Sequence, residues 1–179
     1  MWGFYTLIEE IDKIFLETHY GNKDGDLFKS IGGNLEYLGP DGTSYHKWYE
    51  LKTNKDENNF TDLINFTDKI NNTPSAFWAD SVAAYHNLTA YIKQYAASML
   101  FASLDSYTGS GRNYFLYKNT KTHKFEFIVW DANTSFGQFP VIKGITNLAM
   151  LNPYWVPSDN NPGKRPLNEK ILQQEALKQ

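Results

Sequence analysis

The sequence LDSYTGSGRNYFLYKNTKTHKFEFIVWDANTSFG, at residues 104–137, contains an acidic loop, two strands and a second acidic loop. The aromatic run Tyr114–Tyr117 and the apolar run Phe125–Trp130 have the composition of β-strands. The polar residues 118–124 between them predict a long hairpin turn. An antiparallel hairpin returns the chain to the end where it started, so we expect the two acidic loops to lie side by side.

The expected strand register places one side chain from each loop at the same end of the hairpin. If Tyr117 pairs with Phe125, then Asn113 lies opposite Val129, and Asp131 lies just beyond. Cross-strand neighbours and their diagonals are about 5–8 Å apart. We therefore expect Asn113 and Asp131 to share one ligand.

A third oxygen donor precedes the hairpin. Asp105 lies where the preceding helix is expected to end, and Gly109 and Gly111 make the connecting loop flexible. Mg²⁺ binds one or two carboxylates together with water and substrate phosphates. The sequence thus predicts a divalent-metal site formed by Asp105, Asn113 and Asp131. Acidic residues at hairpin ends also serve as caps and turns, and that structural role is the alternative.

The order of these residues matches the catalytic region of protein kinases. There, a catalytic Asp, an Asn, a strand pair and a metal-binding Asp beside Phe-Gly follow one another. Here Asp105, Asn113, the hairpin and Asp131 are followed by Phe136-Gly137. The spacing differs, because the Asp and the Asn are eight residues apart here, against about five in kinases. The Phe-Gly pair also does not adjoin the second Asp.

The remainder of the chain predicts an α+β fold. Asp12 is expected to cap a short helix that ends near Gly21. The expected strands are Phe4–Ile8, Leu27–Phe28, Leu35–Leu38 and Trp48–Thr53, and the other expected helices are Phe60–Ile70, Ser81–Leu104 and a terminal stretch, Arg165–Gln179. The Ser81–Leu104 helix has the clearest pattern, because its apolar residues recur at intervals of three and four.

Composition limits the possible functions. The chain has 179 residues, enough for one domain with a substantial core. A net charge of −3 argues against a general binder of nucleic acid or membrane surfaces. No apolar run is long enough to span a membrane. The absence of cysteine excludes disulfides, thiolate zinc sites and a cysteine nucleophile.

Asn22-x-Asp24-Gly25-Asp26 resembles the start of a calcium-binding loop. Such a loop needs a Glu at its twelfth position, and that position is Gly33 here. A tight turn is the better interpretation.

The chain is expected to be an excised segment of a single domain. Met1 is followed at once by Trp2 and the strand-like Phe4–Ile8, without a basic leader or a cleavage site. The terminal helical stretch stops without a cap or a glycine.

Four ordered blocks resemble the spore-coat-protein CotH kinase family. They are GFYTLIEEIDKIFL at residues 3–16, YELKTN at 49–54, LDSYTGSGRNYFLY at 104–117 and FEFIVWDANTSFG at 125–137, with a weaker continuation at Arg165-Pro166-Leu167. The resemblance implies an atypical protein-kinase-like fold, of which this chain holds mainly the hinge and the C-lobe, with a long helix before the catalytic hairpin. It also implies transfer of phosphate from ATP to Ser or Thr of partner proteins, with Mg²⁺ as cofactor.

The resemblance also implies roles for the site residues. Asp105 resembles the catalytic-loop aspartate and contributes to the metal site. Asp131 resembles the metal-binding aspartate, and Asn113 resembles a supporting polar residue.

A second group of residues is implied to bind the nucleotide. Glu9, Glu10 and Ile11 follow the strand that leads into the hinge of kinase-like folds, so their backbone is expected to face the adenine. Tyr5 or Trp130 could supply an aromatic wall, although both are equally good core residues.

One part of the family pattern is missing from this sequence. The basic residue that holds the α- and β-phosphates of ATP belongs to an N-lobe upstream of Trp2. A kinase needs that residue as well as the metal, so we expect the isolated segment to have little or no phosphotransferase activity. The implied partners are ATP and a protein substrate or surface protein, at an extracytoplasmic, cell-surface or spore-associated location.

Two other functions remain open at this point. The same scaffold can serve as a surface or binding module, in which aromatic and Asn side chains contact carbohydrate or protein. A metal-dependent phosphoesterase also begins with two aspartates, but the sequence shows no His-Asp cluster for its further ligands.

Overall fold

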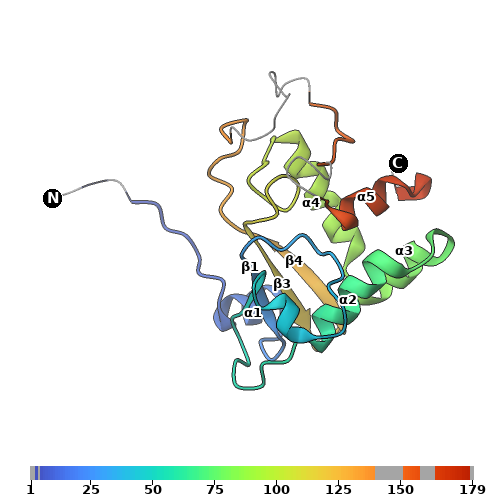
Figure 1. The fold of residues 1–179 in the computed structure, drawn as a ribbon. Helices are drawn as coiled ribbons and strands as arrows, with labels where there is room; N and C mark the ends of the chain where they lie inside the picture. Colours follow the sequence, from blue (N-terminus) through green and yellow to red (C-terminus); the bar gives the residue numbers. More distant parts are fainter. Residues whose placement is uncertain (1–2, 4, 140–150, 158–163, 178–179) are drawn as a thin grey trace.

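The computed structural model describes residues 3, 5–139, 151–157 and 164–177. The fold is α+β, as the sequence predicts (Figure 1). In chain order, the elements are α1 (Lys13–Tyr20), β1 (Leu27–Ser30), η1 (Gly42–Tyr45), β2 (Tyr49–Leu51), α2 (Thr61–Asn72), α3 (Ser75–Tyr85), α4 (Leu88–Leu100), β3 (Tyr114–Asn119), β4 (Lys124–Val129), α5 (Pro166–Leu172) and η3 (Glu175–Leu177). None of the helices in the described ranges combines the length and the apolar character that crossing a membrane requires.

The strands form one antiparallel sheet in the order β2-β1-β3-β4. The predicted hairpin is confirmed as β3 and β4, and its turn is shorter than expected, at residues 120–123. β1 pairs with the other side of β3, with Phe28 opposite Leu116 and Lys29 opposite Phe115. The hairpin therefore lies inside a larger sheet instead of standing alone, which fixes the end that carries the candidate site.

Alternate residues of the strands face two separate cores. Phe28 and Leu116 face the larger core, which contains side chains from α2, α3, α4 and α5. Leu27 and Phe115, one residue along each strand, face a smaller core that Leu16 of α1 completes. Figure 1 shows the larger helical layer, α2 to α5, beside the hairpin. The hairpin is thus held by apolar packing on both of its faces.

The predicted helix Ser81–Leu104 is wrong. The structure has two helices, α3 and α4, separated by His86 and Asn87. His86 has the extended conformation (φ −138°, ψ 145°) and forms a parallel bridge with Phe125 of β4. Asn87 accepts a hydrogen bond from the backbone N–H of Ala90 and so caps α4. The apolar pattern of a helix continues across His86 and Asn87, but pairing of His86 with β4 breaks the helix there. Only α4 therefore leads into the candidate site.

The predicted strand Phe4–Ile8 is also wrong over the residues that the structure describes. Residues 5–8 form neither helix nor strand, and Tyr5 and Leu7 are 86% and 99% exposed. Figure 1 shows this segment extending away from the sheet. A strand needs a neighbour that pairs with its backbone N–H and C=O groups, and no strand of the described sheet pairs with these residues. Phe4 lies outside the described residues.

The predicted terminal helical stretch Arg165–Gln179 is confirmed only in part, as the seven-residue helix α5 and the separate 3₁₀ helix η3, and residues 178–179 lie outside the described residues. The other remaining predicted elements are confirmed with shifted ends, except for one. Leu35–Leu38 is not a strand. Leu35 has a φ of +62°, which lies in the left-handed region and outside the β region. Its side chain is nevertheless fully buried in the larger core, so the apolar pattern indicated burial and not a strand.

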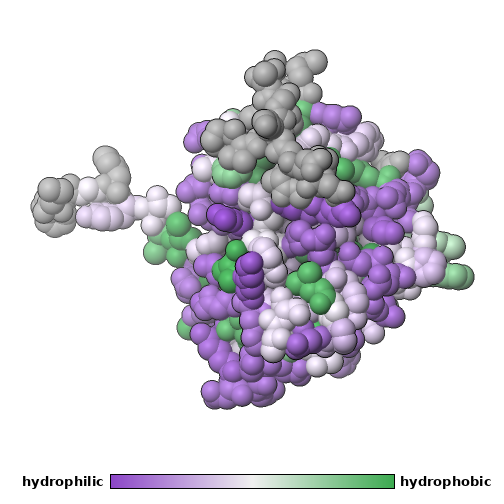
Figure 2. All heavy atoms as spheres, viewed as in Figure 1, coloured by the Kyte–Doolittle hydropathy of each residue, from purple (hydrophilic) through white to green (hydrophobic). Residues whose placement is uncertain are grey.

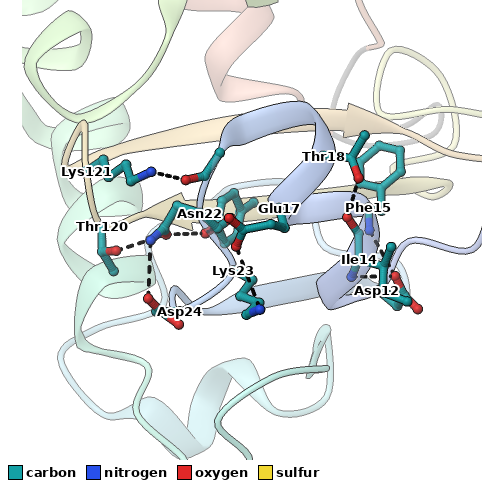
Figure 3. A network of polar contacts seen from close by, with 12 residues as sticks. Asp12, Ile14, Phe15, Glu17, Thr18, Asn22, Lys23, Asp24, Thr120 and Lys121 are labelled. Atoms are coloured by element: carbon teal, nitrogen blue, oxygen red, sulfur yellow. Dashed lines mark hydrogen bonds and ion pairs between the residues drawn. The ribbon is translucent and has the colours of Figure 1, made fainter.

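A polar network connects α1 to the far end of the hairpin (Figure 3). Asp12 caps α1 by accepting hydrogen bonds from two backbone N–H groups of its first turn, as predicted. Beyond the helix, the side-chain oxygen of Asn22 accepts hydrogen bonds from the hydroxyls of Tyr117 and Thr120, at 2.5 and 2.9 Å. The Asn22 oxygen is therefore already used by protein donors. Residues 22–26 form an irregular segment with a bend at Gly25, which anchors the hairpin through Asn22.

Candidate functional site

The register of the hairpin differs by one residue from the predicted one. Tyr117 pairs with Glu126, not with Phe125. Beyond the last ladder pair, the backbone N–H of Trp130 donates to the carbonyl of Asn113 across 2.9 Å. Asp131 is the next residue, so the observed register brings it closer along the strand to Asn113 than expected.

Burial explains this register. The predicted pairing would place Glu126 opposite Leu116, whose side chain is fully buried in the larger core. In the observed pairing, Phe127 lies opposite Leu116 and packs against the same core. A shift of one residue exchanges the two faces of a strand, so core composition selects the register.

The loop before β3 brings Asp105 and Asn113 together. The side-chain amide nitrogen of Asn113 donates to the backbone carbonyl of Asp105 across 2.8 Å. The hydroxyl of Ser110 donates to Oδ1 of the Asp105 carboxylate, also at 2.8 Å. Ser110 was not identified from the sequence, because a serine in a glycine-rich loop carries no distinctive signal.

The two glycines of this loop are required by different constraints. A Cβ atom at Gly109 would lie 2.0 Å from the carbonyl oxygen of Leu104, which no side chain can tolerate. Gly111 has a φ of +76°, in the region that glycine adopts most readily. The sequence predicts a flexible loop here, whereas the structure shows a tight one in which the glycines permit close backbone approach.

Asp131 lies in a second loop that folds onto the first. Its side chain is exposed, and it follows Trp130, which is bonded to Asn113. Further along, the backbone N–H of Phe136 donates to the carbonyl of Phe101 across 2.7 Å, at the end of α4. Contacts on both sides of Asp131 thus hold the two loops together. Within the described residues, no hydrogen bond joins the Asp131 carboxylate directly to the side chains of Asp105 or Asn113.

Left-handed backbone conformations gather at this site. The described part of the chain has eight non-glycine residues with positive φ, and four of them, Ala102, Asn113, Asp131 and Phe136, lie in the two loops that follow α4 and β4. Non-glycine residues rarely adopt this region, and it costs of order 1–3 kcal/mol each. Such residues cluster at ligand-binding and catalytic sites. The sequence alone does not reveal these backbone angles. They occur in the same two loops in which the sequence analysis placed the candidate metal-site residues.

The donor set fits a hard divalent cation. The amide nitrogen of Asn113 faces the Asp105 carbonyl, which leaves Oδ1 of Asn113 as an acceptor. Asp105 retains Oδ2 beside the Ser110 contact, and Asp131 retains both oxygens. The described residues contain no group of three or more His, Asp or Glu side chains that could hold a metal. A site of two carboxylates and one amide suits Mg²⁺, which keeps water and phosphate ligands, better than a fully protein-coordinated ion.

An open, mostly apolar pocket of about 330 Å³ adjoins these loops. It lies between α4, the end of β4 and the second loop. Its lining residues are Gln94, Ala97, Ser98, Phe101, Ser103, Val129, Ala132, Ser135 and Phe136. The sequence did not indicate this pocket, because its residues come from two separated segments, 94–103 and 129–136.

The residues expected to face adenine separate into two groups. Ile11 is buried in the smaller core, and Trp130 packs against the same core. Trp130 also meets Phe115 edge to face, with ring centroids 5.8 Å apart. Glu9 and Glu10 are instead exposed. The structure therefore brings Ile11 and Trp130 into one cluster, while Glu9 and Glu10 carry their carboxylates into solvent.

The Glu9 carboxylate and the Glu10 backbone carbonyl already have partners within the protein. The carboxylate of Glu9 lies 3.1 Å from the ring of His19. The carbonyl of Glu10 accepts from the backbone N–H of Asp12. Lys29, which the sequence did not indicate as a site residue, lies beside the Phe115 ring of the smaller core. Its Nζ is 5.6 Å from the ring centroid.

Buried tyrosines pack beside the Asp105 loop, where the rings of Tyr107 and Tyr114 meet edge to face with centroids 5.3 Å apart. The hydroxyl of Tyr114 donates to the carbonyl of Gly33 across 2.8 Å and lies 3.3 Å from the hydroxyl of Tyr49. Burial raises the pKa of Tyr49 to about 12 and that of Tyr114 well above its ordinary value. Both hydroxyls therefore stay protonated at neutral pH.

Comparison with known proteins gives one family and one curated relative. The family model described as CotH kinase protein matches residues 1–179. The inner spore coat protein H of Bacillus subtilis (strain 168) is 30% identical over 142 residues. The matched region covers 76% of this chain and 38% of that protein. The chain thus spans well under half the length of this curated relative.

Proposed function

This chain belongs to the CotH kinase protein family, and we propose that it carries the metal- and nucleotide-binding region of an ATP- and Mg²⁺-dependent protein kinase. The proposed fold is an atypical kinase-like one, represented here by the hinge and the C-lobe. The reaction is transfer of the γ-phosphoryl group of ATP to a Ser or Thr hydroxyl of a protein. Membership of the family supports this proposal, together with the order of site residues.

The observation that carries the proposal is the bond from the Asn113 amide to the Asp105 carbonyl. It orients Oδ1 of Asn113 away from the backbone of the loop, where it is available to a cation. The same bond holds Asp105 beside the start of β3, next to the strand that leads into Asp131. Asn113 and Asp131 thereby flank the end of one hairpin, and the bond holds Asp105, from the loop after α4, at the same end.

Each residue has a separate role in this proposal. Asp105 orients the acceptor hydroxyl and receives its proton, and Ser110 fixes the rotamer of the Asp105 carboxylate. Asn113 and Asp131, together with Asp105, would hold the cation. Mg²⁺ bound there would supply positive charge to neutralise the phosphate oxygens. Two of these side chains, Asp105 and Asn113, are held by hydrogen bonds before substrate binds, which lowers the reorganisation that the reaction needs.

The nucleotide base is proposed to lie against the smaller core. Ile11, Phe115 and Trp130 offer an apolar and aromatic edge on one face of the sheet. Lys29 lies on that face above the Phe115 ring and offers a cation to the phosphates or the ribose. Glu9 and Glu10 contribute through the backbone of the segment that precedes Ile11.

The partner is proposed to be a protein, and the location is proposed to be spore-associated. The supporting observation is that the relative from Bacillus subtilis is described as an inner spore coat protein. On the face drawn in Figure 2, hydrophobic residues form small patches separated by hydrophilic ones. That face gives no specific support to a separate function as an apolar docking module.

Nucleotide-dependent stabilisation tests the proposal. A ligand at 100 times its Kd stabilises the folded state by about 2.7 kcal/mol, which raises the Tm of a chain of this size by several degrees. We expect Mg²⁺ with ATP to raise the Tm, and neither component alone to do so to the same extent. Asp131→Asn should abolish the increase, whereas Asp80→Asn, an exposed aspartate on α3, should retain it. An equal increase in both variants, or none in the parent, contradicts the proposal.

A further inference from the structure

We infer that Arg165 is a positioning residue, which holds the loop between Asp105 and Asn113 in its metal-binding shape. The inference rests on the proposed function, because it assigns that loop to the site. Arg165 comes from the C-terminal part of the chain, directly before α5, and the resemblance gave it no role. Its guanidinium reaches across the molecule into the loop.

The guanidinium binds the backbone of the loop at two points. Nε donates to the carbonyl of Tyr107 across 2.6 Å, and Nη2 donates to the carbonyl of Gly109 across 2.5 Å. Nη1 donates to the carbonyl of Lys164 across 2.6 Å. Arg165 is only 2% exposed. Buried carbonyl groups need hydrogen-bond donors, and Arg165 supplies them where no strand or helix does.

The shape of the guanidinium explains why arginine is suited to this position. Its N–H groups form a planar fork that can donate in several directions from one rigid group. A lysine has a single nitrogen at the end of its side chain, so it cannot span the Tyr107 and Gly109 carbonyls in the same way. Burial lowers the pKa of Arg165 from its usual value, although nearby tyrosines oppose that shift. The group remains charged at neutral pH, because arginine titrates far above it.

Packing around Arg165 is equally specific. A Cβ atom on Gly111 would lie 3.0 Å from Nη2 of Arg165. The guanidinium carbon lies 5.9 Å from the centroid of the Tyr107 ring. The hydroxyl of Tyr107 in turn accepts from the backbone N–H of Leu167 and donates to the carbonyl of Asn34. The segment at the start of α5 is thus joined to the loop by hydrogen bonds in both directions.

These contacts lie inside the turn that positions the site residues. The N–H of Ser110 donates to the carbonyl of Leu104, and the N–H of Gly111 donates to the carbonyl of Ser106. The Arg165-bound carbonyls, at residues 107 and 109, lie between the two ends of this turn. Loss of the guanidinium therefore leaves two buried carbonyls without these donors, within a few residues of Asp105. The turn is expected to loosen before the sheet or the helices do.

The test compares Arg165→Gln and Arg165→Lys with the matched control Lys170→Gln. Lys170 is a half-buried cation on α5, and among the described residues its side chain makes no hydrogen bond or ion pair with the loop. Amide hydrogen exchange at residues 110 and 111 reports the turn, and exchange at β3 and β4 reports the sheet. Mn²⁺ affinity, measured by electron paramagnetic resonance, reports the site.

We expect both Arg165 variants to accelerate exchange at residues 110 and 111 by about tenfold or more while the hairpin stays protected. Mn²⁺ affinity should fall by about 10–100-fold, the range for a lost supporting contact at a metal site. Arg165→Lys tests the same role with the charge retained. It is the variant to interpret if Arg165→Gln does not fold. The control should match the parent in both measurements.

Two outcomes overturn the inference. One is a folded Arg165 variant whose loop amides and Mn²⁺ affinity are unchanged. The other is loss of protection across the whole sheet in both Arg165 variants, since that shows a general structural role. If the parent itself binds no Mn²⁺, the proposed function fails, and the exchange at residues 110 and 111 still decides whether Arg165 restrains the loop.

Discussion

The amide nitrogen of Asn113 donates to the backbone carbonyl of Asp105 across 2.8 Å, and this bond connects the first residue before β3 to the loop that follows α4. Because a carbonyl can only accept, the nitrogen of the amide must face Asp105 and the oxygen must face away. One side chain therefore both closes the loop and presents a ligand atom. Its backbone φ of +57° is compatible with asparagine more than with most other residues.

Replacing Asn113 separates these two contributions. Asn113→Ala removes the side-chain bond and keeps a β-carbon at a positive φ without the local hydrogen bond that asparagine makes there, and it should lower the free energy of unfolding by about 1–3 kcal/mol. Asn113→Gly removes the same bond without the backbone strain, so it should be the more stable of the two by about 1 kcal/mol. Urea unfolding measures both. Equal stability of the two variants would show that the left-handed conformation carries no cost here.

Gly109 should be intolerant of any side chain. A Cβ atom there would lie 2.0 Å from the Leu104 carbonyl oxygen, whereas Gly39, at φ +95°, has nothing within 4 Å. Gly39→Ala should cost about 1 kcal/mol from its backbone alone. Gly109→Ala should cost more than about 3 kcal/mol or displace the loop. Thermal unfolding gives the comparison, and similar costs for the two substitutions would contradict the observed loop.

Stability should depend on pH through His86. Nδ1 of this buried ring lies 2.8 Å from the carbonyl of Phe125 and must donate to it, while Nε2 has no partner among the described residues. Burial lowers the pKa of His86 to about 4. The unfolded state, with a pKa near 6.5, therefore binds more protons between those two values. The stability that neutral His86 contributes is fully present above about pH 6.5. It is lost as the pH falls toward 4, by about 3 kcal/mol in total.

His86→Gln isolates this effect, because burial also raises the pKa of Glu126 and Asp26, whose titrations act in the opposite direction. Lys124 lies close enough to lower the pKa of His86 further. The difference in unfolding free energy between the parent and His86→Gln should decrease from pH 7 to pH 4. A difference that is constant across this range is the contradicting result.

Trp130 should contribute to binding of the base and not of the phosphates. Trp130→Ala should weaken Mg²⁺-ADP binding by about tenfold, an effect of the size of one aromatic contact. Binding of Mg²⁺ with tripolyphosphate, which has no base, should not change. Isothermal titration calorimetry measures both ligands, and Trp48→Ala, a partly exposed tryptophan beside β2, is the control. Equal losses for both ligands would place Trp130 in the metal site instead.

The sequence was most informative where local pattern and core packing agree. The aromatic and apolar runs on either side of a polar stretch predicted the hairpin, and Asp12 and Gly21 predicted the two ends of α1. These features depend on residues close together in the chain. The residues selected for the metal site, Asp105 and Asn113, are likewise joined by contacts within one short loop.

The errors arose where distant segments decide the structure. The break at His86 depends on its bridge to Phe125, which a helical pattern does not reveal. The register depends on which face of β4 enters the larger core. The role inferred for Arg165 depends on carbonyls 56 and 58 residues away in the sequence. None of these contacts has a local signal.

The position of a bound divalent ion tests the proposed site most directly. Crystals of the protein with Mn²⁺ and a non-hydrolysable ATP analogue would show the ion by its anomalous scattering. We predict one ion at about 2.1–2.3 Å from oxygens of Asp131 and of Asn113 or Asp105, with phosphate oxygens completing its coordination. An ion bound elsewhere, or nucleotide bound with these three side chains uninvolved, would contradict the site.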